Sequence, residues 1–223
     1  MNFLAHFVLA TKLNKSPDFL AGSILPDIAK RAGFATPNFL ITEFQSRNSE
    51  LFSGIRFHLA ADRFFHNSDL FKEGMAFWKL GLEEAKTGLS KTFFLHHLLF
   101  EMWLDKILMV QNPDAAIKMY ETLNLLNIDE LDRFSNAFYS DSEGKIKRIY
   151  QGFLERKFIL AYPSNASFTE ISEGVFCHVT RQVPKQGLYA QILEKVIEME
   201  NHQDYFLKLW KDFNLIFFKN QDQ

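Results

Sequence analysis

The stretch RFHLAADRFFHNSDLF, residues 56–71, decides the fold class of this chain. An α-helix turns about 100° per residue, so side chains four positions apart project from one stripe of the helix. His58, Asp62 and His66 have this spacing, and apolar residues surround them in the sequence. The pattern predicts a helix, over 49–67, that carries imidazole and carboxylate groups on a surface otherwise suited to burial.

The same periodicity extends outward along the chain, and sustained strict alternation, which is typical of half-buried strands, is absent. Several segments begin as helices do, with Ser or Thr before Pro in SPDFLAGSIL and TPNFLITEF. Ser167, with Glu170 three positions later, forms a predicted capping box. We expect an all-α bundle of about ten helices, over 2–13, 17–31, 37–47, 49–67, 69–86, 91–111, 113–125, 128–139, 143–160, 168–182, and one or two from 185 to the end.

Composition indicates one large core. Of 223 residues, 47% are hydrophobic and 25 are Phe, and no long Pro, Gly or Ser-rich linker interrupts the chain. We therefore predict one domain, 1–223, and assign the abundant Phe to its core.

Charge and cysteine content narrow the function classes. A net charge of -2 argues against nucleic-acid binding, which needs a concentrated cationic face. The lone Cys177 excludes an intramolecular disulfide and favours a reducing compartment, so we expect a cytoplasmic protein.

The opening MNFLAHFVLATKLNK lacks a basic stretch before its apolar run and predicts a first helix, not a targeting segment. No window reaches the roughly 18 uninterrupted apolar residues that a membrane span requires.

A second helix carries the same four-residue spacing as the first. In FFLHHLLFEMWLDKIL, residues 93–108, His97, Glu101 and Asp105 are each four apart. With His97 facing inward, His96 can face solvent.

Two further polar residues stand in apolar surroundings nearer the start. His6 lies within FLAHFV, and Asp27 follows Pro26 in AGSILPDIAK, where Gly22 permits close backbone packing just upstream. Buried polar groups need partners, and a shared metal ion would gather all four segments. Imidazole and carboxylate ligands without Cys suit Mn²⁺, Fe²⁺ or Zn²⁺. Such an ion lowers the pKa of bound water and stabilises charge on phosphoryl oxygens, as in a hydrolase.

Structural interpretations remain open beside this one. His6 alone fits a core imidazole bonded to a backbone carbonyl, and Asp27 alone fits a helix cap. The stripe of His58, Asp62 and His66 also fits surface ion pairing, with Asp62 beside Arg56 or Arg63.

The quoted segments, taken together, resemble a known family. MNFLAH, AGSILPDI, GIRFHLAADRFFHNSDLF and LHHLLFEMWLDKIL occur in the order and spacing of the bacterial acyl carrier protein phosphodiesterases. The late segment AYPSNASFTEISEGVFCHVTRQVP is similar to theirs as well, with Tyr162 and Arg181. The family is similar to the HD-domain superfamily of all-helical, metal-dependent phosphohydrolases.

The resemblance implies an HD-domain-like bundle that hydrolytically releases 4'-phosphopantetheine from holo acyl carrier protein, with Mn²⁺ favoured. His6, Asp27, His58 and Asp62 match the family's motif positions. Together with the four-residue spacings, this gives the predicted metal ligands His6, Asp27, His58, Asp62, His97 and Glu101. The predicted catalytic residues, with the water-activating group left open between the two acids, are Asp62, Glu101 and His66.

Three positions depart from the family. His66 stands where the family shows an acid, and His97 and Glu101 stand where it shows Asp-x-x-x-Asp. Imidazole in place of carboxylate keeps a ligand but removes a negative charge, and Glu reaches one methylene further than Asp. These departures indicate changed metal preference or substrate.

Basic residues supply the predicted substrate contacts. A guanidinium grips two phosphate oxygens at once, and the predicted phosphate clamp is Arg56, Arg63 and Arg181. Acyl carrier proteins are acidic, so basic clusters would attract one. These clusters, which also fit an ordinary solvated face, are residues 30–31, 145–148 and 156–157.

Two other functions stay open from the sequence. The same site can serve an HD-like hydrolase of another small phosphoester. Alternatively, the protein is a non-catalytic helical binding module in which the His and acid cluster is a hydrogen-bonded core or holds a structural ion.

Overall fold

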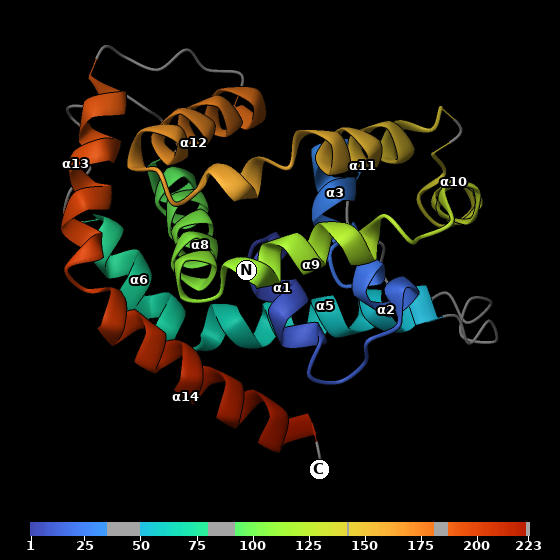
Figure 1. Ribbon diagram of the computed structural model, residues 1–223, viewed down its shortest axis with the longest axis horizontal. Helices are drawn as coiled ribbons and strands as arrows, with labels where there is room; N and C mark the ends of the chain where they lie inside the picture. Colours follow the sequence, from blue (N-terminus) through green and yellow to red (C-terminus); the bar gives the residue numbers. More distant parts are fainter. Residues whose placement is uncertain (35–49, 80–91, 142, 181–186, 222–223) are drawn as a thin grey trace. The chain divides into compact units, whose positions relative to one another are not determined.

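The computed structural model describes residues 1–34, 50–79, 92–141, 143–180 and 187–221 (Figure 1). These ranges hold twelve α-helices and a short 3-10 turn, and they contain no β-strand. The prediction of an all-α bundle is confirmed. No helix within the described ranges is both long enough and apolar enough to cross a lipid bilayer.

The chain forms two compact units, each built from separate stretches of sequence. Unit 1 comprises Met1, Ala61–Pro113 and Ile159–Gln223, and unit 2 comprises Asn2–Ala60 and Asp114–Phe158. The assignment of 1–223 to one domain stays a prediction.

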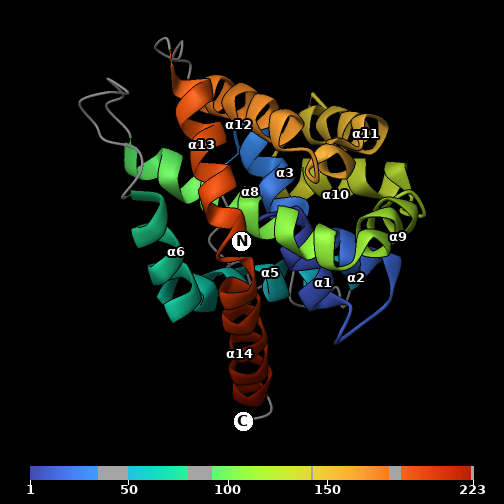
Figure 2. The same cartoon turned by 60° about the vertical axis from the view of Figure 1, so that its left-hand side comes forward.

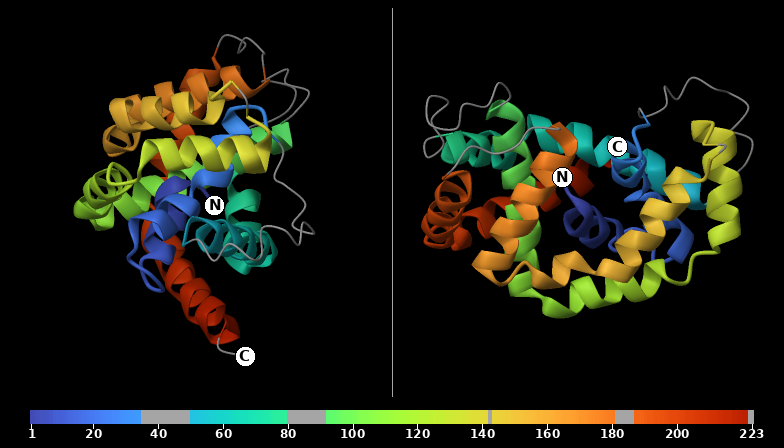
Figure 3. Two further views of the ribbon diagram at one scale, coloured as in Figure 1. Left: turned by 90° about the vertical axis from the view of Figure 1, so that its right-hand side faces the viewer. Right: turned by 90° about the horizontal axis from the view of Figure 1, so that it is seen from above.

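Unit 2 is built around short N-terminal helices and two later ones. Helix α11 packs against α3 and against α10, and α2 contacts both α1 and α3, as two further views show (Figure 3). The helices that lie in unit 2, or begin or end in it, are α1 (Phe3–Ala10), α2 (Pro17–Gly22), α3 (Leu25–Arg31), α5 (Glu50–Asn67), α9 (Pro113–Leu123), α10 (Ile128–Tyr139) and α11 (Lys145–Arg156).

A close crossing of α2 and α5 fixes part of unit 2. A Cβ added to Gly54 would lie 2.1 Å from the carbonyl oxygen of Phe19 and 2.9 Å from the Cα of Gly22. A Cβ added to Gly22 would lie equally close, 2.1 Å, to the carbonyl oxygen of Leu51. Only two glycines allow the backbones to approach this closely, so the expectation of close packing at Gly22 is confirmed.

Unit 1 is a helical assembly with an aromatic core. Helix α12 lies beside α13, and α6 packs against α8 and α14 (Figures 1 and 2). The Phe65 and Phe100 rings stack with centroids 6.2 Å apart, and Trp103 meets Phe206 edge to face at 5.2 Å. The elements are α6 (Asp69–Lys79), α8 (Thr92–Gln111), η1 (Phe158–Ala161), α12 (Asn165–Thr180), α13 (Leu188–Glu200) and α14 (Gln203–Gln221).

Several predicted helix ends are wrong for identifiable reasons. The predicted helix 17–31 is two helices, because Pro26 stands in the first turn of α3 and cannot continue a helix from α2. The predicted helix 143–160 stops at Arg156, because Lys157 adopts a left-handed conformation with φ 44°. Helix α12 begins before Ser167, whose N–H donates to Ser164 Oγ at 3.3 Å, so Ser164 takes the predicted capping role. The predicted helix 37–47 lies outside the described residues.

Candidate functional site

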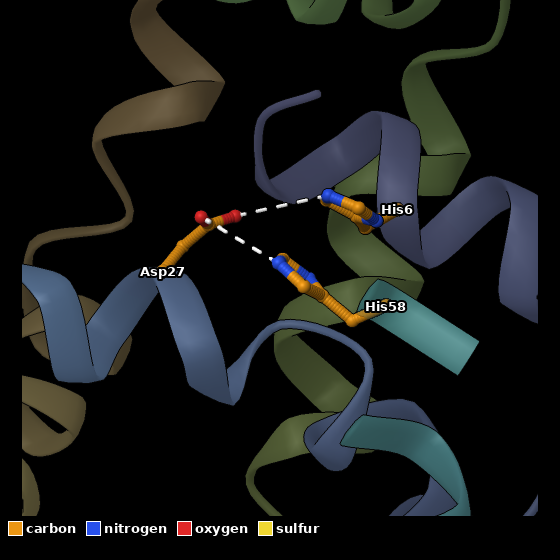
Figure 4. A group of neighbouring side chains, drawn as sticks. All are labelled: His6, Asp27 and His58. Atoms are coloured by element: carbon orange, nitrogen blue, oxygen red, sulfur yellow. Dashed lines mark ion pairs between the residues drawn. The ribbon is translucent and has the colours of Figure 1, made fainter. Parts of the chain in front are cut away.

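Three predicted ligands from separate helices of unit 2 meet at one place, here called the His6 group. It consists of His6 on α1, Asp27 on α3 and His58 on α5, and Figure 4 shows the carboxylate facing both rings. Both imidazoles are fully buried and the Asp27 side chain is 16% exposed. One ligand atom from each residue lies within 4.8 Å of the other two.

The separations within the His6 group are wider than hydrogen bonds. His6 Nε2 lies 4.0 Å from Asp27 Oδ2, and His58 Nε2 lies 3.9 Å from Asp27 Oδ1. The two rings stack with centroids 3.9 Å apart. Ligand atoms around a tetrahedral ion with bonds of about 2.1 Å are about 3.4 Å apart. The two separations from Asp27 would therefore shorten by about half an ångström around such an ion.

The glycine crossing orients His58. Its Nδ1 atom lies 2.8 Å from the carbonyl oxygen of Ser23, which directly follows Gly22. A carbonyl oxygen only accepts, so Nδ1 carries the proton, and Nε2, which faces Asp27, is the atom left to bind a metal ion when the ring is neutral. A metal-binding histidine typically has such an outer hydrogen bond.

Asp27 is held by residues of its own unit. Lys30 Nζ lies 3.5 Å from Asp27 Oδ1, whereas no hydrogen bond within the described ranges reaches the buried Asp27 Oδ2. The N-cap of α3 is Ile24, so Asp27 does not cap that helix. Burial raises the pKa of the nearby Tyr139 phenol, and the negative charge of Asp27 raises this pKa further.

Three more predicted site residues meet in unit 1, in what is here called the Glu101 group. It consists of His66 on α5 with His97 and Glu101 on α8. His97 Nε2 lies 2.7 Å from Glu101 Oε1 and 3.1 Å from His66 Nε2, and His66 Nε2 lies 3.4 Å from Glu101 Oε1. The three side chains are 16% to 32% exposed. The group is more open and more tightly spaced than the His6 group.

Two further groups touch the Glu101 group. Asp62 Oδ2 lies 3.6 Å from His66 Nδ1, one turn along α5. The α-amino group of Met1 donates to Asp62 Oδ1 and to Glu101 Oε1, both at 2.8 Å. Asp62, a predicted ligand and catalytic acid, therefore contacts His66 and Met1.

The Glu101 carboxyl has an unusual acidity. Burial alone raises its pKa, but the Met1 ammonium, the close contacts with the His66 and His97 rings, and the charge of His97 when that ring is protonated together hold the pKa well below its ordinary value. Glu101 therefore stays ionised and able to accept a cation at neutral pH.

The structure reverses the expected orientation of the neighbouring histidines of α8. His96 is buried, at 5% exposed, and the His97 side chain is 26% exposed. The reason is that His96 shares a helical stripe with Phe100 and Trp103, which form the unit 1 core.

The structure describes two of the three arginines in the predicted phosphate clamp. Arg56 and Arg63 lie on the exposed face of α5, whereas Arg181 lies outside the described residues. Tyr162, part of the late segment in the family resemblance, is fully buried against Phe168.

Sequence reasoning missed the Ser23 carbonyl, Gly54, Tyr139 and the Met1 amine. For two of them a signal was present: Ser23 follows Gly22, and Gly54 lies four positions before His58. Tyr139 lies at the end of α10 in a polar stretch of sequence, so no sequence signal marked it as part of the site.

The chain was compared with known proteins. No protein-family model, curated protein or solved structure matches it. The family resemblance, the HD-like class, the metal and the enzymatic activity therefore stay predictions.

Proposed function

We propose that this protein is a metal-dependent phosphodiesterase of the cytoplasm that releases 4'-phosphopantetheine from holo acyl carrier protein. The observation that carries the proposal is the convergence of His6, Asp27 and His58 from three helices of unit 2. Two buried imidazoles and a carboxylate, without a thiolate, are a donor set for Mn²⁺, Fe²⁺ or Zn²⁺. The resemblance of the sequence to the carrier protein phosphodiesterases favours Mn²⁺.

Each residue of the His6 group has a role in this function. When bound, a divalent ion polarises the phosphoryl oxygens and lowers the pKa of water. His6 and His58 would hold the ion through Nε2, and Asp27 would hold it through a carboxylate oxygen. The Ser23 carbonyl fixes the His58 tautomer that makes this possible.

The assignment of the proton-transferring acid follows the sequence prediction. Asp62 and Glu101, the two candidates for this role, and His66 all belong to unit 1, and their roles stay predictions. Arg56 of unit 2 and Arg63 of unit 1 are both exposed on α5, and their role as phosphate ligands stays a prediction.

Charge supports an acidic protein as the substrate. The three basic clusters of the sequence fall on α3 and at the two ends of α11, and these helices pack against each other in unit 2. Some of the charge is neutralised locally, since Lys145 pairs with Glu143 at 3.0 Å and Lys147 lies 3.5 Å from Asp129. Arg156 and Lys157 are exposed at the other end of the helix and would attract an acidic carrier.

The test uses the full chain and holo acyl carrier protein. We expect the metal-free protein to be inactive and Mn²⁺ to restore conversion of holo to apo carrier, measured by intact mass. His58→Ala should lose this activity, whereas His178→Ala, at an exposed position on α12, should keep it.

The negative outcomes separate the other candidate functions. Metal binding without carrier hydrolysis under Mn²⁺, Fe²⁺ or Zn²⁺ would exclude this substrate and direct a search to other phosphoesters. Absence of metal binding by the His6 group would leave a helical binding module.

A further inference from the structure

The Glu101 group has a donor set and a geometry of its own. We propose that His66, His97 and Glu101 form a second cation site, independent of the His6 group, that binds a divalent first-row transition metal such as Zn²⁺. The inference goes beyond the proposed function, because it does not require that the protein hydrolyse any phosphoester.

The spacing of the three ligand atoms carries the inference. They form a triangle with sides of 2.7, 3.1 and 3.4 Å. With bonds of about 2.1 Å, ligand atoms are about 3.0 Å apart at right angles and about 3.4 Å apart at tetrahedral angles. The group therefore needs little rearrangement to receive an ion on one face, with the remaining positions open.

Hydrogen bonding alone accounts less well for this triangle. The three contacts are the three pairwise distances among one set of three atoms, which are His66 Nε2, His97 Nε2 and Glu101 Oε1. A proton on His97 Nε2 that points to Glu101 turns away from His66, and protons on both Nε2 atoms would repel each other. One cation would satisfy all three lone pairs at once.

A carboxylate lies behind one ligand of the proposed site. Asp62 Oδ2 lies 3.6 Å from His66 Nδ1, on the far side of the ring from the Nε2 atom that faces His97. A carboxylate behind a ligating imidazole holds the ring in place and increases its basicity, so Asp62 is a positioning residue for this site. The Met1 ammonium contacts both carboxylates, at Asp62 Oδ1 and at Glu101 Oε1.

The ligand types indicate the class of metal. Two imidazoles and one carboxylate are the protein ligands of several zinc enzymes and of ferrous sites with open positions. Mg²⁺ prefers oxygen ligands in octahedral geometry and is disfavoured.

The test counts metal ions on variants of the full chain. Apoprotein prepared with a chelator is dialysed against Zn²⁺ and analysed for bound zinc, and parallel calorimetric titrations give the affinities. We expect two equivalents on the wild type and one equivalent after His97→Ala. The matched control is His178→Ala, which removes an exposed histidine of α12 in the same unit. This variant should keep two equivalents.

A second variant guards against misfolding. Glu101→Gln keeps the size of the side chain but removes its charge, and it should also hold one equivalent, with a circular dichroism spectrum like that of the wild type. The proposal is overturned if the wild type binds one equivalent that His58→Ala removes, or if His97→Ala and Glu101→Gln both retain the full zinc content.

Failure of the proposed function looks different from failure of this inference. Zinc that is lost from His97→Ala and retained by His58→Ala supports the second site even if no carrier protein is hydrolysed. Hydrolysis that needs His58 while His97→Ala retains all bound zinc supports the proposed function and overturns the second site.

Discussion

The His6 group and the Glu101 group have nearly the same donors and opposite surroundings. Each offers two imidazoles and one carboxylate, but the rings of the His6 group are fully buried, whereas those of the Glu101 group are 32% and 26% exposed. The first has separations of 3.9 to 4.0 Å to its carboxylate, and the second has 2.7 to 3.4 Å. Donor type alone therefore does not determine what such a group can do.

The difference arises from how each group is assembled. His97 and Glu101 are four residues apart on α8, so one helix brings them within contact distance. The His6 group draws one residue from each of α1, α3 and α5, and depends on how these helices pack. We expect the His6 group to be coupled strongly to folding and the Glu101 group weakly.

The largest expected effect comes from the crossing behind His58. Gly54→Ala would place a methyl group 2.1 Å from the Phe19 carbonyl oxygen, so the backbone of α2 or α5 must move. We expect a loss of about 3 kcal/mol in the free energy of unfolding, measured by urea denaturation. The Ser23 carbonyl should lose its contact with His58, and metal binding by the His6 group should weaken.

The control for this substitution is Gly152→Ala on α11, in the same unit. Outside its own helix and chain neighbours, no atom of the described residues lies within 4 Å of a Cβ added at Gly152. Alanine should stabilise this helical position by about 0.5 kcal/mol. Equal effects of the two substitutions would show that the crossing of α2 and α5 is not tight.

The next effect compares one histidine from each group in protein freed of metal by a chelator. His58→Leu leaves the buried Ser23 carbonyl without its N–H donor, and we expect it to cost about 2 kcal/mol of unfolding free energy. His97→Leu, at a partly exposed position, should cost less than about 1 kcal/mol. Thermal unfolding measures both, and similar costs would contradict the difference in coupling to the fold.

The fold was predictable from sequence where local chemistry decides it. Hydrophobic periodicity and capping residues predicted the helices. Ser16, for example, stands before Pro17 as a predicted N-cap, and its Oγ accepts the Phe19 N–H. Helix ends failed where a local break interrupts an apolar pattern that continues, as at Pro26 and Lys157. Periodicity shows which face is buried, but it is insensitive to a single residue that leaves the helical conformation.

The site was predictable in composition and only partly in arrangement. His58, Asp62 and His66 lie four residues apart on one helix, α5, as predicted. However, His58 belongs to the His6 group and His66 to the Glu101 group. The four-residue spacing could not show this, because burial changes along α5 from a fully buried His58 to a partly exposed His66. The Ser23 carbonyl was hidden because backbone atoms carry no sequence signature.

A selectivity change would sharpen the comparison further. His97→Asp replaces an imidazole of the Glu101 group with the carboxylate that the resembled family shows at this position. Carboxylates favour Mn²⁺ and Mg²⁺ over Zn²⁺ more than imidazoles do, so the Zn²⁺ to Mn²⁺ affinity ratio of this site should fall by about tenfold, or about 1.4 kcal/mol. Competition titrations measure the ratio, with His58→Ala as the background so that only one group binds. An unchanged ratio would mean that His97 does not ligate the ion.

The smallest expected effect concerns charge in the unit that holds the His6 group. Arg156→Ala combined with Lys157→Ala removes two exposed cations at the end of α11 without touching any proposed ligand. Because exposed charges act mainly by long-range attraction, the KM for holo acyl carrier protein should rise about threefold at low salt, with kcat unchanged. The difference in KM should shrink at 0.5 M salt, because dissolved ions then screen the attraction between charges that are more than a few ångströms apart. Lys118→Ala and Lys208→Ala, which remove two cations from α9 and α14, form the matched control and should leave KM unchanged. Equal KM changes in both double variants would indicate that net charge, and not the basic end of α11, attracts the carrier.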